Sequence, residues 1–246
     1  MANLKGKIFP DAASLAKNVD LLLVFGGDGT MLRAANEIAG STTPVLGINL
    51  GGLGFLTAIS SDEIQTALKR VLRGEYEIES RSLIQVQGKC CGESINESAL
   101  NDFVISRGII SKLITLEVSV NDQPLTRYRC DGLIVSSPTG STAYALSAGG
   151  AVVHPAADVF QITPICPHTL SNRSVIVSLN SRIQVRVVSP KPDIILTGDG
   201  EMVSEMLPGD SVTIHRSADT VQLLHLPGYS FFDTLRRKLN WSGANV

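Results

Sequence analysis

One aspartate stands inside a glycine turn that ends an apolar run. The run Leu21–Phe25 leads into Gly26-Gly27-Asp28-Gly29, and a helical pattern follows from Thr30. Glycine lets the backbone turn tightly and approach a ligand closely, while the positive end of the following helix favours phosphate. A carboxylate in such a place costs free energy unless it takes part in chemistry or faces a cation. The turn therefore predicts a phosphate-bearing ligand and a chemical role for Asp28.

This turn lacks the features of the common nucleotide loops. No Gly-Lys-Ser/Thr follows it, as a P-loop requires, and Leu32 stands where the G-x-G-x-x-G fingerprint has its last glycine. The chain also lacks the G-x-S-x-G elbow of serine hydrolases. Taken alone, residues 26–29 also fit an ordinary connection between a strand and a helix, because glycine turns are common there.

A second region, residues 129–150, is rich in small and hydroxyl side chains. It contains Asp131-Gly132, a predicted strand, the run Ser136–Thr142, and a short helical segment with Tyr144 and Ser147. Small residues leave room for a flat ring, and hydroxyls satisfy its polar edge. We interpret the region as a binding site for a ring-bearing ligand, with an ordinary Ser/Thr-rich loop as the alternative.

The remaining polar residues are less informative. Asn101-Asp102 precedes a predicted strand over 103–106, but such a pair is also typical of a turn or a cap. The four histidines lack metal-ligand spacing, and no protein metal site is expected. The cysteines show no C-x-x-C spacing, which disfavours a zinc site or a disulfide framework and favours a reduced, cytoplasmic protein. These cysteines are Cys90, Cys91, Cys130 and Cys166.

Two different patterns follow each other along the chain. Up to residue 74 the pattern predicts a helix over 11–18, a strand over 20–25, a helix over 30–38, a strand over 44–49 and a helix over 62–74. Two strand–glycine turn–helix units of this kind indicate a parallel α/β sheet with a ligand at the strand ends.

From about residue 77 the apolar residues alternate, which predicts short strands separated by turns. Three pairs of strands flank turn residues and are interpreted as hairpins: 113–120 with 125–129, 183–188 with 194–197, and 212–215 with 221–225. We predict an all-β, sandwich-like domain over residues 78–225. Residues 1–77 and a helical tail within 226–246 form the α/β domain, to which the tail returns.

The net charge and the lengths of the apolar runs limit the classes of partner that we expect. The 246 residues carry a net charge of −2, which does not point to nucleic acid or to an acidic membrane surface. No apolar run approaches the length of a membrane span, and the first residues lack the apolar core of a signal peptide. We expect neither nucleic acid nor membrane as a partner.

Taken together, these segments resemble the NAD kinase family. The long Asp131–Gly150 stretch is the most specific of them, whereas the first glycine motif also resembles phosphofructokinases and lipid kinases of the diacylglycerol type. The matching segments run in order along the chain and are Gly26–Thr30, Gly47–Asn49, Gly52–Leu56, Asn101-Asp102, Asp131–Gly150, Pro167–Ser171 and Gly198–Gly200.

The resemblance implies transfer of a phosphoryl group to the adenosine 2′-hydroxyl of NAD, giving NADP. It implies ATP or polyphosphate as the donor, a divalent cation such as Mg²⁺ carried mainly by ATP, and a homodimer or homotetramer. It also implies an α/β domain, a β-sandwich-like domain and a returning C-terminal segment, in agreement with the two patterns above.

The resemblance assigns roles residue by residue. Asp28 matches the catalytic aspartate, the proposed proton acceptor, and Gly29 approaches the dinucleotide by its backbone. Arg33, one helical turn further on, could reach a phosphate, as could Lys112 and Arg129. Asn101 and Asp102 match an Asn-Glu pair that hydrogen-bonds the substrate. The residues that line the adenine and nicotinamide ends are Asp131, Thr142, Ala143, Tyr144, Ala145, Leu146 and Ser147.

The chain departs from the family pattern in three places. Asp102 is shorter than the usual Glu, and Glu201 stands where many members have Gln, so no role is carried over to Glu201. Family members have a further strand and helix before the segment that matches Asp11. We therefore expect either a truncated chain or a reduced α/β domain, with lower stability than a full-length relative because apolar edge surface is exposed.

Two other functions remain as alternatives. One is a kinase of another acceptor, such as a lipid or a sugar phosphate, which an acceptor screen would distinguish. The other is a non-catalytic NAD(P)-binding module, which would bind the dinucleotide without turnover in the presence of Mg²⁺ and ATP.

Overall fold

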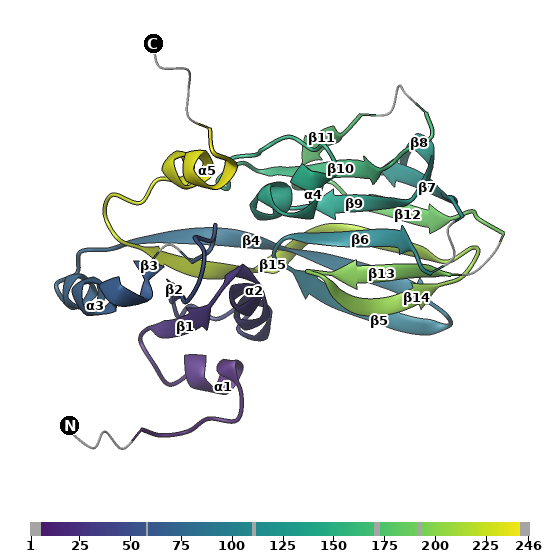
Figure 1. Ribbon diagram of the computed structural model, residues 1–246. Helices are drawn as coiled ribbons and strands as arrows, with labels where there is room; N and C mark the ends of the chain where they lie inside the picture. The colour runs from purple at the N-terminus through teal and green to yellow at the C-terminus, as the bar shows by residue number, and fades with distance from the viewer. Residues whose placement is uncertain (1–5, 58, 110–111, 170–172, 191–192, 242–246) are drawn as a thin grey trace, which may run out of the picture. The chain divides into compact units, whose positions relative to one another are not determined.

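The computed structural model describes residues 6–57, 59–109, 112–169, 173–190 and 193–241. The chain forms two compact units, Met1–Ser80 with Asp219–Val246, and Arg81–Ala218 (Figure 1). Two long strands, β4 (Glu77–Cys90) and β15 (Ser211–His225), pass from one unit into the other. The division predicted above, at residues 77 and 226, stays a prediction about the domains.

The first unit is built on a parallel sheet, as the repeated strand–turn–helix pattern predicts. β1 (Leu22–Gly26) pairs along its whole length with β2 (Val45–Asn49). β3 (Ile59–Ser60) and the last part of β15 pair with β2 on its other side, also in parallel. The helices of this unit are α1 (Ala12–Ala16), α2 (Asp28–Glu37), α3 (Ile64–Leu72) and α5 (Phe231–Leu239).

Two helices cover opposite faces of this sheet. Leu46 and Ile48 of β2 belong to a buried cluster with Ala67 of α3. Between them Gly47 points the other way, where an added Cβ would lie 3.0 Å from Met31 Sδ of α2. The alternation of a strand thus places α2 and α3 on the two sides of β2.

Helix α2 begins two residues earlier than the predicted start at Thr30. Gly27 is its N-cap, with extended backbone, so Asp28 is the first helical residue. The amides of Thr30 and Met31 both donate to the Gly27 carbonyl, which closes the first turn. The candidate catalytic carboxylate therefore belongs to a rigid helix and not to a free turn.

The second unit is a β-sandwich, and this confirms the predicted change of architecture. One sheet contains β4, β5 (Glu93–Ala99), β7 (Ile114–Val120), β8 (Gln123–Cys130), β12 (Ile183–Val187) and the first part of β15. The other has the order β11-β10-β9-β6-β13-β14, with β11 (Val175–Ser178), β10 (Val159–Ile165), β9 (Gly132–Ser136), β6 (Asp102–Arg107), β13 (Ile194–Gly198) and β14 (Glu201–Met206). Side chains from both sheets form one buried core, for example Leu116 and Val185 with Phe103 and Leu133.

One predicted hairpin is confirmed, and two are wrong. β7 and β8 pair across Asn121-Asp122, which adopt φ values of 51° and 63° as a two-residue hairpin turn requires. β12 and β13 do not pair, because β12 joins β7 and β15 while β13 joins β6 and β14 in the other sheet. Residues 217–219 form no turn; β15 runs through them, and Ser217 is buried.

The C-terminal helix is well delimited by its sequence. Ser230 is the N-cap and accepts a hydrogen bond from the Asp233 amide, and Asn240 ends the helix in the left-handed conformation. The Phe231 ring lies 6.4 Å from the Phe55 ring, so α5 returns to the first unit as predicted. In the part of the chain that the structure describes, no helix is long and apolar enough to cross a membrane.

Candidate active site

The Asp28 carboxylate holds the second glycine-rich segment of the first unit. Its Oδ2 accepts a hydrogen bond from the Phe55 amide at 2.9 Å, and its Oδ1 accepts one from the Leu56 amide at 3.0 Å. The Thr57 hydroxyl lies 3.5 Å from Oδ1. A carboxylate has about four acceptor positions, so two backbone donors fix its orientation and leave capacity for a further hydrogen bond.

Glycine at position 54 makes this arrangement possible. A Cβ added there would overlap Asp28 Oδ1 and Thr57 Oγ1. The buried Asn49 secures the start of the same segment, since its side chain accepts from the Gly51 amide at 2.7 Å and donates to the Gly52 carbonyl at 2.5 Å. The two glycine motifs of the sequence are thus joined by side-chain contacts to backbone groups.

The backbone beside Asp28 is open to a ligand. Gly27 and Gly29 are exposed, and a Cβ at either position would meet no atom within 4 Å. They surround the N-terminal end of α2, whose amides and dipole favour an anion. Arg33 lies on the same helix, one turn further on, and is exposed. This end of the first unit can therefore receive a phosphate next to a fixed carboxylate.

In the second unit, the segment Leu100–Asp102 is attached to the small-residue loop. The Ser137 amide donates to the Asn101 carbonyl at 2.8 Å, and the Ser137 hydroxyl donates to the Leu100 carbonyl at 2.5 Å. Gly140 packs directly on Asn101, where an added Cβ would overlap the carbonyl oxygen and lie 2.6 Å from the carbonyl carbon. Two motifs that are far apart in the sequence are thus held together by hydrogen bonds and close packing.

The Asp102 carboxyl is almost completely buried, with 4% of the residue exposed. Burial, and then the negative charge of Asp199, raise the pKa of Asp102 from 3.8 to about 7. Near neutral pH this side chain therefore exists partly as a neutral acid, which can donate a hydrogen bond as well as accept one.

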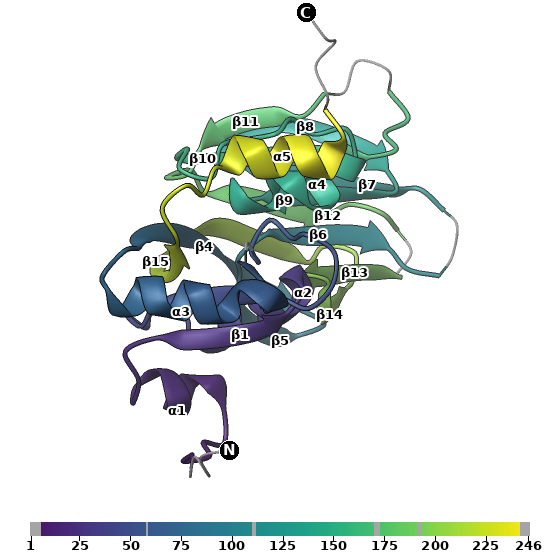
Figure 2. The ribbon, with the colours of Figure 1, turned by 60° about the vertical axis from the view of Figure 1, so that its left-hand side comes forward.

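Asp131 already has a partner within the second unit. Its Oδ1 accepts a hydrogen bond from Arg107 Nε at 2.7 Å, and the two side chains are about one-third exposed. The Arg107 amide also donates to the Asp131 carbonyl at 2.9 Å. The ion pair fixes the orientation of the Asp131 carboxylate, just before the start of β9. Strand β9 lies beside α4 (Tyr144–Ser147) of the same unit (Figure 2).

The loop after β9 forms the predicted short helical segment. A 3₁₀ turn over Thr139–Thr142 leads into α4 (Tyr144–Ser147). Tyr144 and Ser147 are exposed, whereas Ala145 is fully buried against Val104 and Ile134. Arg81 of β4, which is 3% exposed, donates to the Thr139 hydroxyl at 3.3 Å and so holds the loop.

The remaining sequence-predicted residues lie on the surface of the second unit. Thr142, Ala143 and Leu146 are partly exposed around α4. Lys112 and Arg129 are exposed, Lys112 just before β7 and Arg129 near the end of β8. Their side chains are accessible to a phosphate group from solvent.

The structure adds residues that the sequence did not single out. Phe55 and Leu56 contribute only backbone amides, which carry no side-chain signal. Arg107 is visible as a partner of Asp131 only once β6 and β9 are known to pair. Asp199 was part of a matching motif without a role, and its negative charge acts on Asp102.

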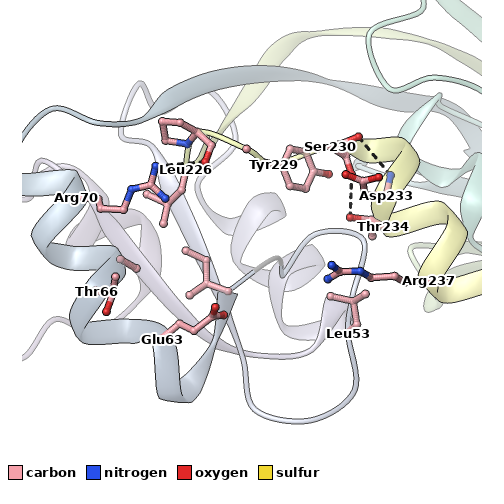
Figure 3. A pocket seen from close by; sticks show the side chains of 14 residues that line it. Leu53, Glu63, Thr66, Arg70, Leu226, Tyr229, Ser230, Asp233, Thr234 and Arg237 are labelled. Atoms are coloured by element: carbon pink, nitrogen blue, oxygen red, sulfur yellow. Dashed lines mark hydrogen bonds between the residues drawn. The ribbon is translucent and has the colours of Figure 1, made fainter.

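A separate cavity of about 340 Å³ lies in the first unit, between α3, residues 226–230 and the first turns of α5 (Figure 3). Two arginines, Arg70 and Arg237, and two carboxylates, Glu63 and Asp233, line it. Arg70 already donates to Glu75 and to the Pro227 carbonyl, each at 3.3 Å. The lining therefore does not select a ligand of one charge.

Among the described residues, no group of three or more His, Cys, Asp or Glu side chains is arranged to hold a metal ion. Mg²⁺ that binds together with a nucleotide needs only one or two carboxylates, because phosphates and water supply its other ligands. Asp28, with acceptor positions to spare beside the end of α2, fits that requirement.

Comparison with known proteins accounts for this arrangement. The family model of the ATP-NAD kinase N-terminal domain matches residues 12–76, and the model of the ATP-NAD kinase C-terminal domain matches residues 100–226. Together the two models match more than half of the chain.

Individual relatives agree. An NAD kinase of Symbiobacterium thermophilum is 47% identical over 223 residues, which are 90% of this chain and 79% of the relative. One from Geobacter sp. is 41% identical over 94% of this chain and 81% of the relative.

Solved structures show the same fold. Yeast NADH kinase complexed with NADH superposes with a TM-score of 0.88 at 28% identity, covering 95% of this chain and 69% of the yeast chain. An NAD kinase from Archaeoglobus fulgidus in complex with ATP gives a TM-score of 0.77 at 29% identity, covering 95% and 87% of the two chains. The chain therefore belongs to the NAD kinase family, and phosphorylation of NAD is the activity that this membership assigns to it.

Proposed function

We propose that this chain uses ATP to phosphorylate the adenosine 2′-hydroxyl of NAD, and that Asp28 directs the hydroxyl oxygen onto the phosphorus. The observation that carries the proposal is the Asp28 carboxylate at the open end of α2, oriented by the Phe55 and Leu56 amides. ATP is the proposed donor because a solved relative is an ATP complex. Polyphosphate is the second donor to be tested.

The chemical step needs orientation more than it needs a strong base. A bond forms between the 2′-oxygen of NAD and the γ-phosphorus of ATP, the bond from that phosphorus to the bridging oxygen breaks, and ADP leaves. Phosphoryl transfer usually has a loose transition state, so the hydroxyl proton leaves late. A fixed carboxylate that accepts a hydrogen bond from the hydroxyl aligns the attacking lone pair and then takes the proton.

We assign recognition of NAD mainly to the second unit. Asn101 and Asp102 would hydrogen-bond the dinucleotide, and Asp131 would do so with its orientation fixed by Arg107. Thr142–Ser147 would line the ring-binding surface, with Tyr144 and Ser147 exposed and Ala145 buried beneath them. Gly29, Arg33, Lys112 and Arg129 would contact phosphates, in keeping with their exposure.

A divalent cation, with Mg²⁺ as our candidate, would neutralise charge on the donor phosphates when bound. We propose that ATP carries it and that the protein contributes at most the Asp28 carboxylate. We also propose a cytoplasmic homodimer or homotetramer, in keeping with the family resemblance and with the cysteine spacing.

The decisive experiment replaces Asp28 with Asn. We expect NADP formation to fall by about 10²-fold or more, the usual range for a lost acid–base group, while NAD still binds. The assay supplies NAD with ATP or polyphosphate and Mg²⁺ and measures NADP, and calorimetry measures NAD binding.

Asp28→Asn also weakens the hold on residues 55–56, so a matched control is needed. Asn49→Ala removes two hydrogen bonds from the same glycine segment and leaves the carboxylate in place. We expect Asn49→Ala to lower activity by about tenfold or less, as the loss of one or two ordinary hydrogen bonds would. Full activity of Asp28→Asn, or equal losses in the two variants, would refute the proposed role of Asp28.

A further inference from the structure

We propose that Asp199 is a positioning residue for NAD, because its carboxylate holds the backbone segment that presents Asn101 and Asp102. This inference rests on the proposed function, in which those two residues bind the dinucleotide. Asp199 itself need not touch the ligand.

The carboxylate of Asp199 accepts hydrogen bonds from three consecutive amides. Oδ2 accepts from Leu100 at 2.8 Å, and Oδ1 accepts from Asn101 at 2.7 Å and from Asp102 at 3.3 Å. The Asp199 amide in turn donates to the Asp102 carbonyl at 3.0 Å. Asp199 is therefore bound to this segment through both its side chain and its backbone.

The turn that carries Asp199 is suited to this task. Asp199 and Gly200 have φ values of 49° and 84°, both left-handed, as in the tight turn that joins β13 to β14. Aspartate is one of the few residues other than glycine that tolerate this conformation. Gly198 lies opposite Phe103 in the paired strands, which brings the turn next to the start of β6.

The segment of residues 100–102 is held from two sides, and Asp199 holds the amide side. Ser137 and Gly140 fix the carbonyl side of residues 100–101, while Asp199 fixes the amide side. Without the carboxylate, three amides lose their acceptor while the carbonyls stay attached, so the peptide planes can rotate. Rotation moves the Asn101 side chain, which is the atom group that would meet NAD.

The test is a graded series at position 199. Asp199→Asn keeps the left-handed conformation and one acceptor oxygen, and Asp199→Gly keeps the conformation and removes both oxygens. The Michaelis constant for NAD should rise about tenfold in the first variant and further in the second, as expected for hydrogen bonds to a charged group. The Michaelis constant for ATP should stay unchanged, and kcat should fall less than kcat/KM for NAD.

Asp210 provides a matched control. Its Oδ2 accepts the amides of Cys91 at 2.9 Å and Leu207 at 2.8 Å, beyond the opposite end of β14 from Asp199. Asp210→Asn should lower the melting temperature in a similar way and leave the Michaelis constant for NAD within about twofold, because its lost hydrogen bond lies far from residues 100–102.

The remaining outcomes are distinguishable when Asn101→Ala is measured in the same assay. If Asn101→Ala raises the Michaelis constant for NAD and Asp199→Asn does not, the role of Asp199 is overturned and the proposed function stands. If the Asp199 and Asp210 variants lose only folded enzyme, with the NAD constant unchanged in both, Asp199 is merely structural and the inference fails. If Asn101→Ala has no effect on the NAD constant, the assignment of Asn101 falls and this inference falls with it.

Discussion

Asp28 in the first unit and Asp199 in the second hold distant segments in the same way, yet they differ in what surrounds them. Asp28 accepts two backbone amides and stands beside exposed glycines. Asp199 accepts three amides of a segment that is also fixed from its other side by Ser137. The Asp28 carboxylate keeps acceptor positions for a ligand, whereas the Asp199 carboxylate uses its acceptor positions for hydrogen bonds within the protein.

The glycines next to the two carboxylates show the same difference. A Cβ on Gly54 would overlap the ends of two side chains, those of Asp28 and Thr57. A Cβ on Gly140 would overlap the backbone of Asn101. Side-chain ends can rotate away if they give up their hydrogen bonds, whereas backbone that is held on both sides cannot. We infer that the Gly54 segment (residues 51–57) is adjustable and that the Asn101 segment (residues 100–102) is fixed.

Gly54→Ala gives the largest effect in this comparison. The new methyl group displaces the Asp28 carboxylate, so we expect kcat to fall by about 10²-fold, as when a catalytic group is misplaced by about 1 Å. The melting temperature should fall less than for the corresponding substitution at Gly140, because only side-chain ends move and the cost is limited to the hydrogen bonds from the Phe55 and Leu56 amides. Steady-state kinetics and a thermal melt of the same sample measure both quantities. A large loss of stability with normal kcat in the folded fraction would contradict the inference that the Gly54 segment is adjustable.

Gly140→Ala should give the opposite result. The methyl group presses on the Asn101 backbone, and overpacking of this kind costs about 1–3 kcal/mol. For a chain of this size we expect the melting temperature to fall by roughly 2–12 °C and the Michaelis constant for NAD to rise. A variant with unchanged melting temperature and unchanged NAD affinity would show that the Asn101 segment is adjustable as well.

The fold follows from local sequence where pairing is local. The parallel strands of the first unit and the Asn121-Asp122 hairpin were predictable because each turn signal lies between its own strands. Turn-like composition was misleading at residues 217–219, where Ser217 is buried and β15 continues. It was also misleading between β12 and β13, because each strand finds its partners in a different sheet.

The site was predictable only in its side chains. The glycine motif pointed to Asp28, but its donors are the amides of Phe55 and Leu56, and an amide leaves no trace in residue type. The Arg107–Asp131 pair depends on the register of β6 and β9. The contacts of Asp199 depend in the same way on the register of β6 and β13. Sequence patterns indicated residues of both segments, but only the pairing of the strands shows which of these residues are in contact.

The smallest expected effect concerns the buried Asp102 carboxyl of the Asn101 segment. Burial and the charge of Asp199 raise the pKa of Asp102 from 3.8 to about 7, so the folded protein binds this proton more tightly than the unfolded chain does. The contribution of Asp102 to stability is therefore greatest below about pH 4, falls as the pH rises from about 4 to about 7, and is constant above that. The opposite trend would hold for an exposed, ion-paired carboxylate.

The measurement compares the wild type with Asp102→Asn, because other groups titrate in the same range and cancel in the difference. Between pH 5.5 and 7 the stability of the wild type relative to the variant should fall by about 2 kcal/mol or less, since one pKa unit corresponds to about 1.4 kcal/mol. Urea titrations at four pH values measure it. A difference that stays constant over this range, or that rises with pH, would mean that Asp102 is ionised in the folded protein. Two charged carboxylates, those of Asp102 and Asp199, would then lie beside the Asn101 segment. The contrast with Asp28 could then no longer be explained by the hydrogen bonds that Asp199 accepts from the protein alone.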